Sequence, residues 1–188
     1  MEKPVRRLIL KMHMSLDGFV GRLDGDVGFI FKSLDDPLTY SIVQDVWQAG
    51  LHIMGAKTYG DMAAWWPTSD EPFAPPMNTI PKAVFSDTLE EAPWGPVQII
   101  RGDLTTGIAH LKAQPGKDIY AHGGASFARA LIAADLVDEY RLVIHPVAIG
   151  RGLAIFSGLP QSRDLALVES KSFPKGAVAN IYHPVRKE

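Results

Sequence analysis

Two stretches of the sequence place glycine between a short apolar run and the expected start of a helix. In residues 119–136, "IYAHGGASFARALIAADL", the run ends at His122 and is followed by Gly123 and Gly124. Glycine lets a ligand approach the backbone closely, and the first N–H groups of a helix lack partners within the helix. Because the helix dipole adds positive charge at this end, the pattern could bind a phosphate. The alternative is a tight turn that only needs a positive φ.

The second stretch, "IMGAKTY" (53–59), repeats this arrangement with Gly55 between strand and helix. Thr58 is the expected helix cap, and Lys57 adds a charge that could pair with a phosphate. The alternative is an ordinary capped turn with a solvated lysine. Two such turns at one edge of a sheet would suit a dinucleotide, whose phosphates need separate binding points.

Ser86 and Arg101 stand at the ends of two further apolar runs, each of which is expected to be a strand. If these strands are parallel to the others, both residues reach the same edge of the sheet. An adenosine 2′-phosphate could then contact them together with Lys57. The sequence contains neither a GxGxxG fingerprint nor a Walker A motif, so it does not match those two nucleotide-binding patterns.

The remaining residue types point away from metal and acyl-transfer chemistry. The six histidines show neither HxH nor HExxH spacing, no serine lies in a GxSxG motif, and the chain has no cysteine. A metal site, a hydrolase nucleophile elbow and disulfides are therefore not expected. Two features stay open. Trp65 could line a pocket for a flat ring or only bury apolar area, and Asp17 could act on a ligand or only cap its turn.

The composition is that of an ordinary globular chain. Its 188 residues are 46% hydrophobic and 21% charged, with a formal net charge of −2. A nucleic-acid footprint across the chain would be basic, and no apolar run approaches the roughly 18 residues of a membrane helix. The N-terminus lacks the unbroken apolar core of a signal peptide. We therefore expect one cytoplasmic domain over residues 1–188, with no nucleic-acid or membrane partner.

Apolar periodicity predicts about eight strands and four helices. Asp36, Asp103 and Ser126 are expected helix caps, and the proline-rich stretch 66–81 should be irregular. The turn at 174–176 should join two final strands into a hairpin. The strands are expected over 7–14, 51–54, 82–86, 97–101, 118–122, 139–150, 165–173 and 177–185, and the helices over 37–49, 55–65, 103–114 and from Ser126 onward.

Strands and helices alternate through most of the chain, and two strands close it. This order predicts an α/β fold with three α-β-α layers. Its sheet should be mostly parallel, eight-stranded and mixed, with an antiparallel C-terminal hairpin. The strand over 139–150 should be central because both of its faces are apolar. Parallel strands also bring their ends to one edge, where the two glycine turns would meet.

Four segments together resemble the dihydrofolate reductase-like superfamily, and within it most closely the riboflavin-biosynthesis reductase (RibD C-terminal) branch. The resemblance spans nearly the whole chain in the right order and implies an eight-stranded sheet and NADPH as the cofactor. The segments are "MSLDGFVG" (14–21), "IMGAKTYGDM" (53–62), "KAVFSDTL" (82–89) and "YAHGGASFARALIAADLVDEYRLVIHPVAIGRG" (120–152).

The resemblance also implies roles for particular residues. The peptide between Gly123 and Gly124 would abut the cofactor pyrophosphate and is often cis in the family. Further expected cofactor contacts are Ala125, Ser126 and Phe127 in the same turn, Gly55, Lys57 and Thr58 in the second turn, Ser86 and Arg101 at the 2′-phosphate, and Val20 and Gly21 beside the nicotinamide. The expected substrate contacts are Met14, Ser15, Asp17 and Trp65.

The substrate half of the chain departs from both branches of the superfamily. Dihydrofolate reductases carry a tryptophan after the first loop, and residues 26–37 contain none. Asp35 or Asp36 could approximate their substrate-binding carboxylate. The riboflavin-pathway enzymes carry a deaminase domain or an arginine-containing segment that binds ribose phosphate, and neither is found. The proton for reduction could come from water or from Asp17, Asp35 or Asp36.

The sequence therefore predicts an NADPH-dependent reductase of a small heterocycle, in riboflavin or folate metabolism. The substrate would resemble 5-amino-6-(5-phosphoribosylamino)uracil or a pterin. The alternative is a nucleotide-binding or regulatory protein that keeps the fold without turnover. The resemblance and the apolar strand over 139–149 also favour a homodimer.

Overall fold

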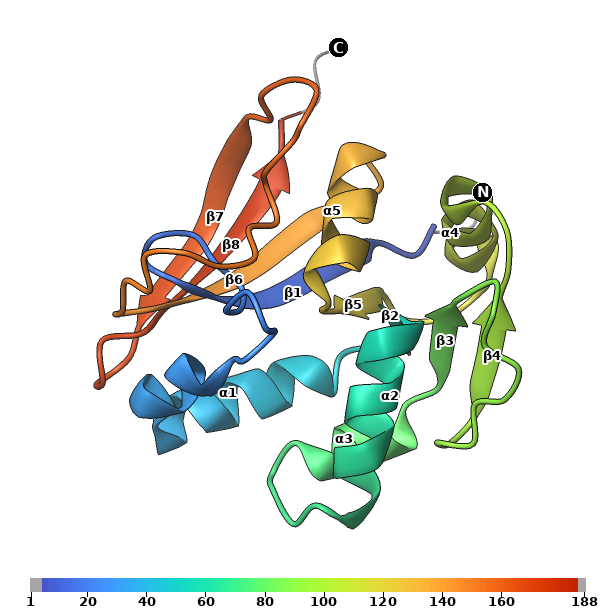
Figure 1. Cartoon of the computed structure of the whole chain (residues 1–188), viewed down its shortest axis with the longest axis horizontal. Helices are drawn as coiled ribbons and strands as arrows, with labels where there is room; N and C mark the ends of the chain where they lie inside the picture. The colour runs from blue at the N-terminus through green and yellow to red at the C-terminus, as the bar shows by residue number, and fades with distance from the viewer. Residues whose placement is uncertain (1–4, 186–188) are drawn as a thin grey trace.

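The computed structural model describes residues 5–185, and its centre is one eight-stranded sheet in the order β4-β3-β2-β5-β1-β6-β8-β7 (Figure 1). The first six strands along this order are parallel, and β8 and β7 are antiparallel. This confirms the predicted mixed sheet and its C-terminal hairpin. The strands are β1 Leu8–Ser15, β2 Leu51–Gly55, β3 Lys82–Phe85, β4 Val97–Ile100, β5 Ile119–His122, β6 Glu139–His145, β7 Leu165–Ser172 and β8 Val178–Pro184.

Helices cover both faces of the sheet, which confirms the predicted three layers. Buried side chains of α4 and α5 pack on one face, and those of α1, α2 and α3 pack on the other (Figure 1). None of the helices in the part of the chain described is long and apolar enough to cross a membrane. The helices are α1 Asp36–Val46, α2 Ala56–Trp65, α3 Ala74–Thr79, α4 Leu104–Ala113 and α5 Ala125–Ala133, with 3-10 turns η1 Gly28–Ser33 and η2 Trp66–Thr68.

The prediction that residues 66–81 are irregular is wrong in part, because η2 and α3 lie within them. Pro75 and Pro76 stand in the first turn of α3. At that position a missing N–H costs no helical hydrogen bond, so proline is tolerated there. Pro67, Pro75 and Pro76 therefore stand in short helices and not in a structureless loop.

Two helix caps can be compared directly with their predictions. The Asp103 carboxylate accepts a hydrogen bond from the Thr106 N–H at 2.8 Å and caps α4, as predicted. Asp35, not Asp36, caps α1 by accepting from the Leu38 N–H at 2.9 Å. The prediction was one residue late because Pro37 is compatible with either of the first two helical positions.

Strand β6 is central as predicted, since it lies between β1 and β8, but it is shorter than the expected 139–150. It ends at His145, and Pro146 follows. Proline has no N–H to donate to a neighbouring strand, so the ladder stops there. Residues 147–153 instead pair by backbone hydrogen bonds with the loop after β1, through Leu16, Val20 and Gly21.

Alternation along β1 determines which residues reach each face of the sheet. Leu8, Leu10, Met12 and Met14 belong to the core under α4 and α5. Lys11 and His13 therefore point to the opposite face, on the side of α1 and α2. In the parallel pairing of β1 with β5, Lys11 is opposite His122, so these two side chains share that face.

Candidate active site

Two helix N-termini lie side by side at one edge of the sheet. Strands β2 and β5 are parallel neighbours, and they lead directly into α2 and α5. The residues that precede these helices are Gly55 and Gly124, and neither helix has a side-chain cap. Unpartnered N–H groups and the positive ends of two helix dipoles therefore meet at this edge.

Thr58 joins the two turns. Its hydroxyl accepts a hydrogen bond from the Gly124 N–H at 2.8 Å. Thr58 is the third residue of α2, so the prediction that it caps this helix is wrong, and its hydroxyl reaches the neighbouring turn instead. Gly123 has a φ of +36°, and a Cβ at Gly124 would lie 3.0 Å from the Thr58 oxygen. A side chain at Gly124 would therefore crowd the Thr58 hydroxyl, and the positive φ at Gly123 favours glycine there.

The other residues of the first turn differ in their surroundings. Ala125 is buried, and Ser126 is exposed as the second residue of α5, so the prediction that Ser126 caps this helix is wrong. The Phe127 ring packs against Phe85 with 5.4 Å between ring centroids. No peptide bond within residues 5–185 is cis, so the Gly123–Gly124 bond, which is often cis in the family, is trans here.

Ser86 and Arg101 lie together at the predicted edge, at the ends of β3 and β4. The Arg101 guanidinium donates to the carbonyls of Asp87 and Leu89, both at 2.7 Å. The Ser86 hydroxyl accepts from the Leu89 N–H at 3.0 Å, so both side chains order the same loop. Lys57 is exposed and pairs with Asp61 on its own helix at 2.9 Å. Among the described residues, no hydrogen bond or ion pair links Lys57 to Ser86 or Arg101.

A cavity of about 520 Å³ adjoins the first glycine turn. Its polar residues on the sheet are Lys11, His13 and His122, which project from β1 and β5. Its walls come from η1, α1, α2 and the segment that contains η2 and α3. Most of these wall residues are apolar, and they include Phe31, Ile42, Met62, Trp65, Trp66 and Phe73. Trp65 thus lines a pocket, and its contact with a flat ring stays a prediction.

Lys11 is buried and forms an ion pair with Asp45 of α1. Burial lowers the pKa of Lys11 below its ordinary value, and the Asp45 carboxylate opposes this shift. Burial alone would raise the pKa of Asp45, but Lys11 and Arg141 outweigh it and hold this pKa below its usual range. The cavity therefore contains a cation whose countercharge comes from α1.

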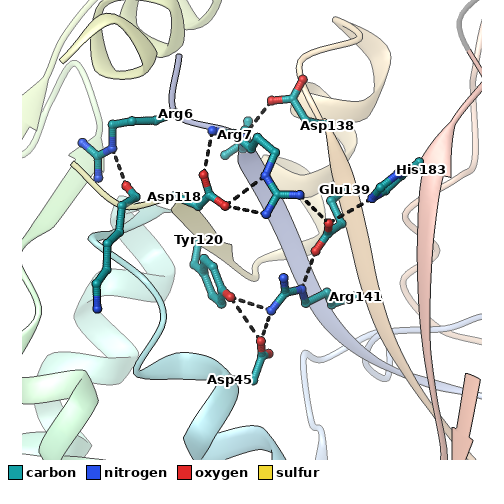
Figure 2. Close-up of polar contacts among 11 residues, drawn as sticks. Arg6, Arg7, Asp45, Asp118, Tyr120, Asp138, Glu139, Arg141 and His183 are labelled. Atoms are coloured by element: carbon teal, nitrogen blue, oxygen red, sulfur yellow. Dashed lines mark hydrogen bonds and ion pairs between the residues drawn. The ribbon is translucent and has the colours of Figure 1, made fainter. Parts of the chain in front are cut away.

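Asp45 pairs with Lys11 and also belongs to a wider network of charges on the same face of the sheet, and Figure 2 shows that network. Arg141 pairs with Asp45 and donates to Glu139 at 2.6 Å. Glu139 also accepts from Arg7 at 2.9 Å and contacts His183 at 3.0 Å. Figure 2 shows Arg7, just before β1, and the side chains of β6, β8 and α1 converging on Glu139 and Asp45. The network holds Asp45, and through it Lys11, in place.

Two pairs of histidines meet at the cavity. Nδ1 of His13 lies 2.8 Å from Nε2 of His145, and Nε2 of His122 lies 2.8 Å from Nδ1 of His52. The Ser33 hydroxyl is 2.7 Å from the other ring nitrogen of His145. Burial lowers the pKa of His13 and of His52 to about 3, lowers the pKa of His145 to about 4, and holds the pKa of His122 well below its usual value. All four rings are therefore neutral near pH 7.

The three aspartates predicted as proton donors do not line this cavity. The Asp17 carboxylate accepts from the N–H groups of Ile149 (3.1 Å) and Gly150 (2.7 Å), and so it fixes a neighbouring loop rather than only its own turn. Hydrogen bonds from Ser15 and from these N–H groups lower its pKa. Asp35 caps α1 and accepts from the Lys175 N–H at 3.0 Å, and hydrogen bonding lowers its pKa as well. Asp36 is exposed at the start of α1.

The residues near the first loop that were expected to contact cofactor or substrate are mostly engaged in contacts within the protein. Met14 and Val20 belong to the core under α4 and α5. The Ser15 hydroxyl accepts from the Phe19 N–H at 3.0 Å. The Gly21 carbonyl accepts from the Leu153 N–H at 2.8 Å. None of these four residues lines the cavity.

Sequence reasoning missed the polar groups of the cavity. Lys11 and His13 alternate with buried apolar residues in an otherwise apolar strand, which was a signal that polar side chains share one face of the sheet. His52 and His122 stand in two different strands, and nothing in their spacing indicates that they meet. Asp45 lies on a helix that is far from Lys11 in sequence.

The chain matches the family model of the RibD C-terminal domain over residues 6–179. It belongs to this family. The uncharacterized protein YyaP of Bacillus subtilis strain 168 is 31% identical over 183 residues, which cover 95% of each chain. The RibD C-terminal domain is a dihydrofolate reductase-like fold, so the match confirms both the resemblance seen in the sequence and the predicted fold class.

Solved structures share the fold. A putative riboflavin biosynthesis protein from Shewanella sp. PV-4 superposes with a TM-score of 0.78 at 22% identity, over 96% of this chain and 99% of that chain. The riboflavin biosynthesis reductase Rib7 of Saccharomyces cerevisiae superposes with a TM-score of 0.64 at 16% identity, over 98% and 92%. At these identities the likeness concerns the fold of the RibD C-terminal domain and not the substrate.

Proposed function

We propose that the protein is an NADPH-dependent reductase of a small, flat heterocyclic substrate, such as a pterin or an aminouracil. One contact carries the proposal: the 2.8 Å hydrogen bond from the Gly124 N–H to the Thr58 hydroxyl. It holds two helix N-termini without side-chain caps next to His122, which lines the cavity. Such a pair of helix ends suits the linked phosphates of a dinucleotide. Members of the RibD C-terminal domain family use NADPH, which supports the same cofactor.

The residues at this edge fit a dinucleotide phosphate. A side chain at Gly124 would crowd the Thr58 hydroxyl that joins the two helix ends, and the φ of +36° at Gly123 favours glycine there. Ser86 and Arg101 lie further along the same edge, two and three strands from β5 in the sheet order. They would take the adenosine 2′-phosphate that distinguishes NADPH from NADH. The exposed ammonium of Lys57 adds positive charge to this edge.

The cavity supplies what a hydride acceptor needs. When bound, NADPH provides the hydride. Negative charge develops on an acceptor that takes a hydride, and a nearby cation stabilises it. Lys11 is that cation, and we assign to it the proton that completes the reduction, because among the described residues it is the one ammonium group that lines the cavity. The apolar walls exclude water from the reacting atoms.

The test is to titrate the purified chain with NADPH and with NADH, and to follow absorbance at 340 nm with a panel of pterins and aminouracils. Tight binding of NADPH, weaker binding of NADH and loss of absorbance with at least one substrate are expected. Absence of NADPH binding would overturn the proposal. A substrate from this panel would also indicate whether the reaction belongs to riboflavin or to folate metabolism.

A second candidate is a nucleotide-binding protein without turnover. It is favoured by the positions of Asp17, Asp35 and Asp36, which hold loops or a helix end and do not face the cavity. Thermal stabilisation by NADPH, with no oxidation of it in the presence of any pterin or aminouracil, would favour this candidate. In that case Lys11→Met would leave NADPH binding unchanged, and neither the variant nor the wild-type protein would oxidise NADPH.

A further inference from the structure

The cavity contains very little positive charge. Among the described residues that line it, Lys11 is the one lysine or arginine. Its ammonium is paired with Asp45, so its charge is already balanced within the protein. Arg141 lies nearby, but it borders a separate groove and bonds to Asp45, Glu139 and Tyr120. Within residues 5–185, a phosphate in the cavity would therefore find one cation, Lys11, and would have to share it with the Asp45 carboxylate.

Glu71 adds negative charge to the cavity wall. It is half-buried, follows η2 and lines the cavity. A phosphate monoester carries nearly two negative charges at pH 7. Such a group would lose water on entering the cavity and would face the Glu71 carboxylate, with Lys11 already paired to Asp45. Both effects disfavour its binding.

The same cavity suits an uncharged ring with a polar edge. Three nitrogen-bearing side chains, Lys11, His13 and His122, share the sheet side of the cavity. Each histidine uses one ring nitrogen on its partner imidazole, which leaves its second ring nitrogen for a ligand. Opposite them stand four aromatic rings, which provide faces for a flat ligand: Phe31, Trp65, Trp66 and Phe73.

We propose that this site takes a flat, uncharged heterocycle without a phosphate and rejects the phosphorylated form of the same compound. The polar edge of the ring would lie on Lys11, His13 and His122, and its plane would pack among the aromatic side chains. This inference rests on the proposed function. It differs from the expectation of a phosphoribosylaminouracil, because the one cation among the described lining residues is already paired with Asp45 and Glu71 adds a negative charge.

Matched ligand pairs test the substrate class. A ribosylated aminouracil and its 5′-phosphate, and riboflavin and riboflavin 5′-phosphate, differ only in the phosphate. Isothermal titration into protein saturated with NADP⁺ gives the affinity for each compound without turnover. At least one unphosphorylated compound is expected to bind about tenfold more tightly than its phosphate, a difference of about 1.4 kcal/mol. Equal or tighter binding of the phosphates, or no binding of any compound, would overturn the proposal.

Two variants test whether Glu71 contributes to this discrimination. Glu71→Gln removes the negative charge from the cavity wall, and the affinity ratio within each pair should fall about threefold. Asp70→Asn removes the same charge one residue away, from an exposed side chain that does not line the cavity. The control should leave the ratio unchanged. An equal effect of both variants would contradict a local role for Glu71.

The result can be separated from a failure of the proposed function, because NADPH affinity is measured on the same protein. Intact NADPH binding together with a preference for the phosphorylated ligands would overturn the substrate class alone. Loss of NADPH binding would overturn both proposals.

Discussion

Thr58 is the residue that most directly tests the proposed cofactor site, since its hydroxyl joins the two glycine turns. Thr58→Ala removes this acceptor and leaves the Gly124 N–H without it. A hydrogen bond of this kind contributes about 1 kcal/mol, so the Kd for NADPH should rise about fivefold. Fluorescence titration measures the change. Thr58→Ser keeps the hydroxyl and should retain wild-type affinity, and unchanged affinity in the alanine variant would contradict the role.

The neutral histidines make a second prediction, for stability against pH. The pKa values of His13 and His52 are lowered to about 3, and that of His145 to about 4, from an ordinary 6.5. As the pH falls below 6.5, the unfolded chain takes up protons that the folded chain does not, so stability is lost. The slope should approach about 1.4 kcal/mol per pH unit for each such imidazole.

Urea denaturation between pH 7 and pH 4.5 measures this slope. His145→Gln removes one imidazole whose pKa is lowered by burial. The slope of stability against pH should therefore fall by up to about 1.4 kcal/mol per pH unit. His110→Gln changes an exposed histidine of α4 and serves as the matched control. Stability that stays constant down to pH 4.5 would contradict the neutral, buried state of these rings.

At the scale of elements, helix α1 is held to the sheet by Asp45, which pairs with Lys11 of β1 and Arg141 of β6. Asp45→Asn leaves both cations without their carboxylate, and such a change to a buried pair should cost about 2 to 4 kcal/mol. Chemical denaturation measures the loss. Asp36→Asn, at the exposed start of the same helix, should cost about 0.5 kcal/mol because it only weakens the interaction with the helix dipole.

The elements themselves could largely be predicted from the sequence, because their signals are local. The alternation in β1, the cap at Asp103 and the hairpin turn at 174–176 each depend on residues close together in the chain. Errors arose where two local solutions compete. Proline suits either of the first two helical positions, so the sequence predicts the cap of α1 at Asp36, one residue after the observed cap Asp35.

The candidate site could be predicted only where it depends on local turns. Gly55 and the Gly123–Gly124 pair were recognisable because each follows an apolar run and precedes a helix. The contact of Thr58 with Gly124 depends on which strands are neighbours, and the order of β2 and β5 in the sheet cannot be deduced from either segment alone. The pairing of Lys11 with Asp45 depends in the same way on where α1 packs.

At the scale of the whole molecule, strand β7 is the open edge of the sheet, next to β8 (Figure 1). From Ala166 to Ser172 all its residues are exposed, including Leu167 and Val168. An exposed edge strand offers unpaired backbone groups to another chain. The strand over 139–149, which the sequence analysis connects with a dimer, is β6 and lies inside the sheet between β1 and β8, so it offers no edge to a partner. We propose that two copies of the chain form a homodimer by antiparallel pairing of β7, which would extend the sheet across both subunits.

The charges of β7 suit such a two-fold arrangement. In antiparallel pairing about a two-fold axis at Ser170, residues equally far from Ser170 in the two copies lie opposite each other. Glu169 of each copy would therefore face Lys171 of the other.

Light scattering should then give about twice the 20.6 kDa of one chain. Lys171→Glu or Glu169→Lys alone sets like charges opposite each other and should shift the protein toward the monomer, because directly opposed like charges destabilise a strand pair. The double exchange, Glu169→Lys with Lys171→Glu, restores opposite charges and should restore the dimer. A wild-type mass of 20.6 kDa would rule the dimer out, and a dimer that survives both single substitutions would place the interface on another surface.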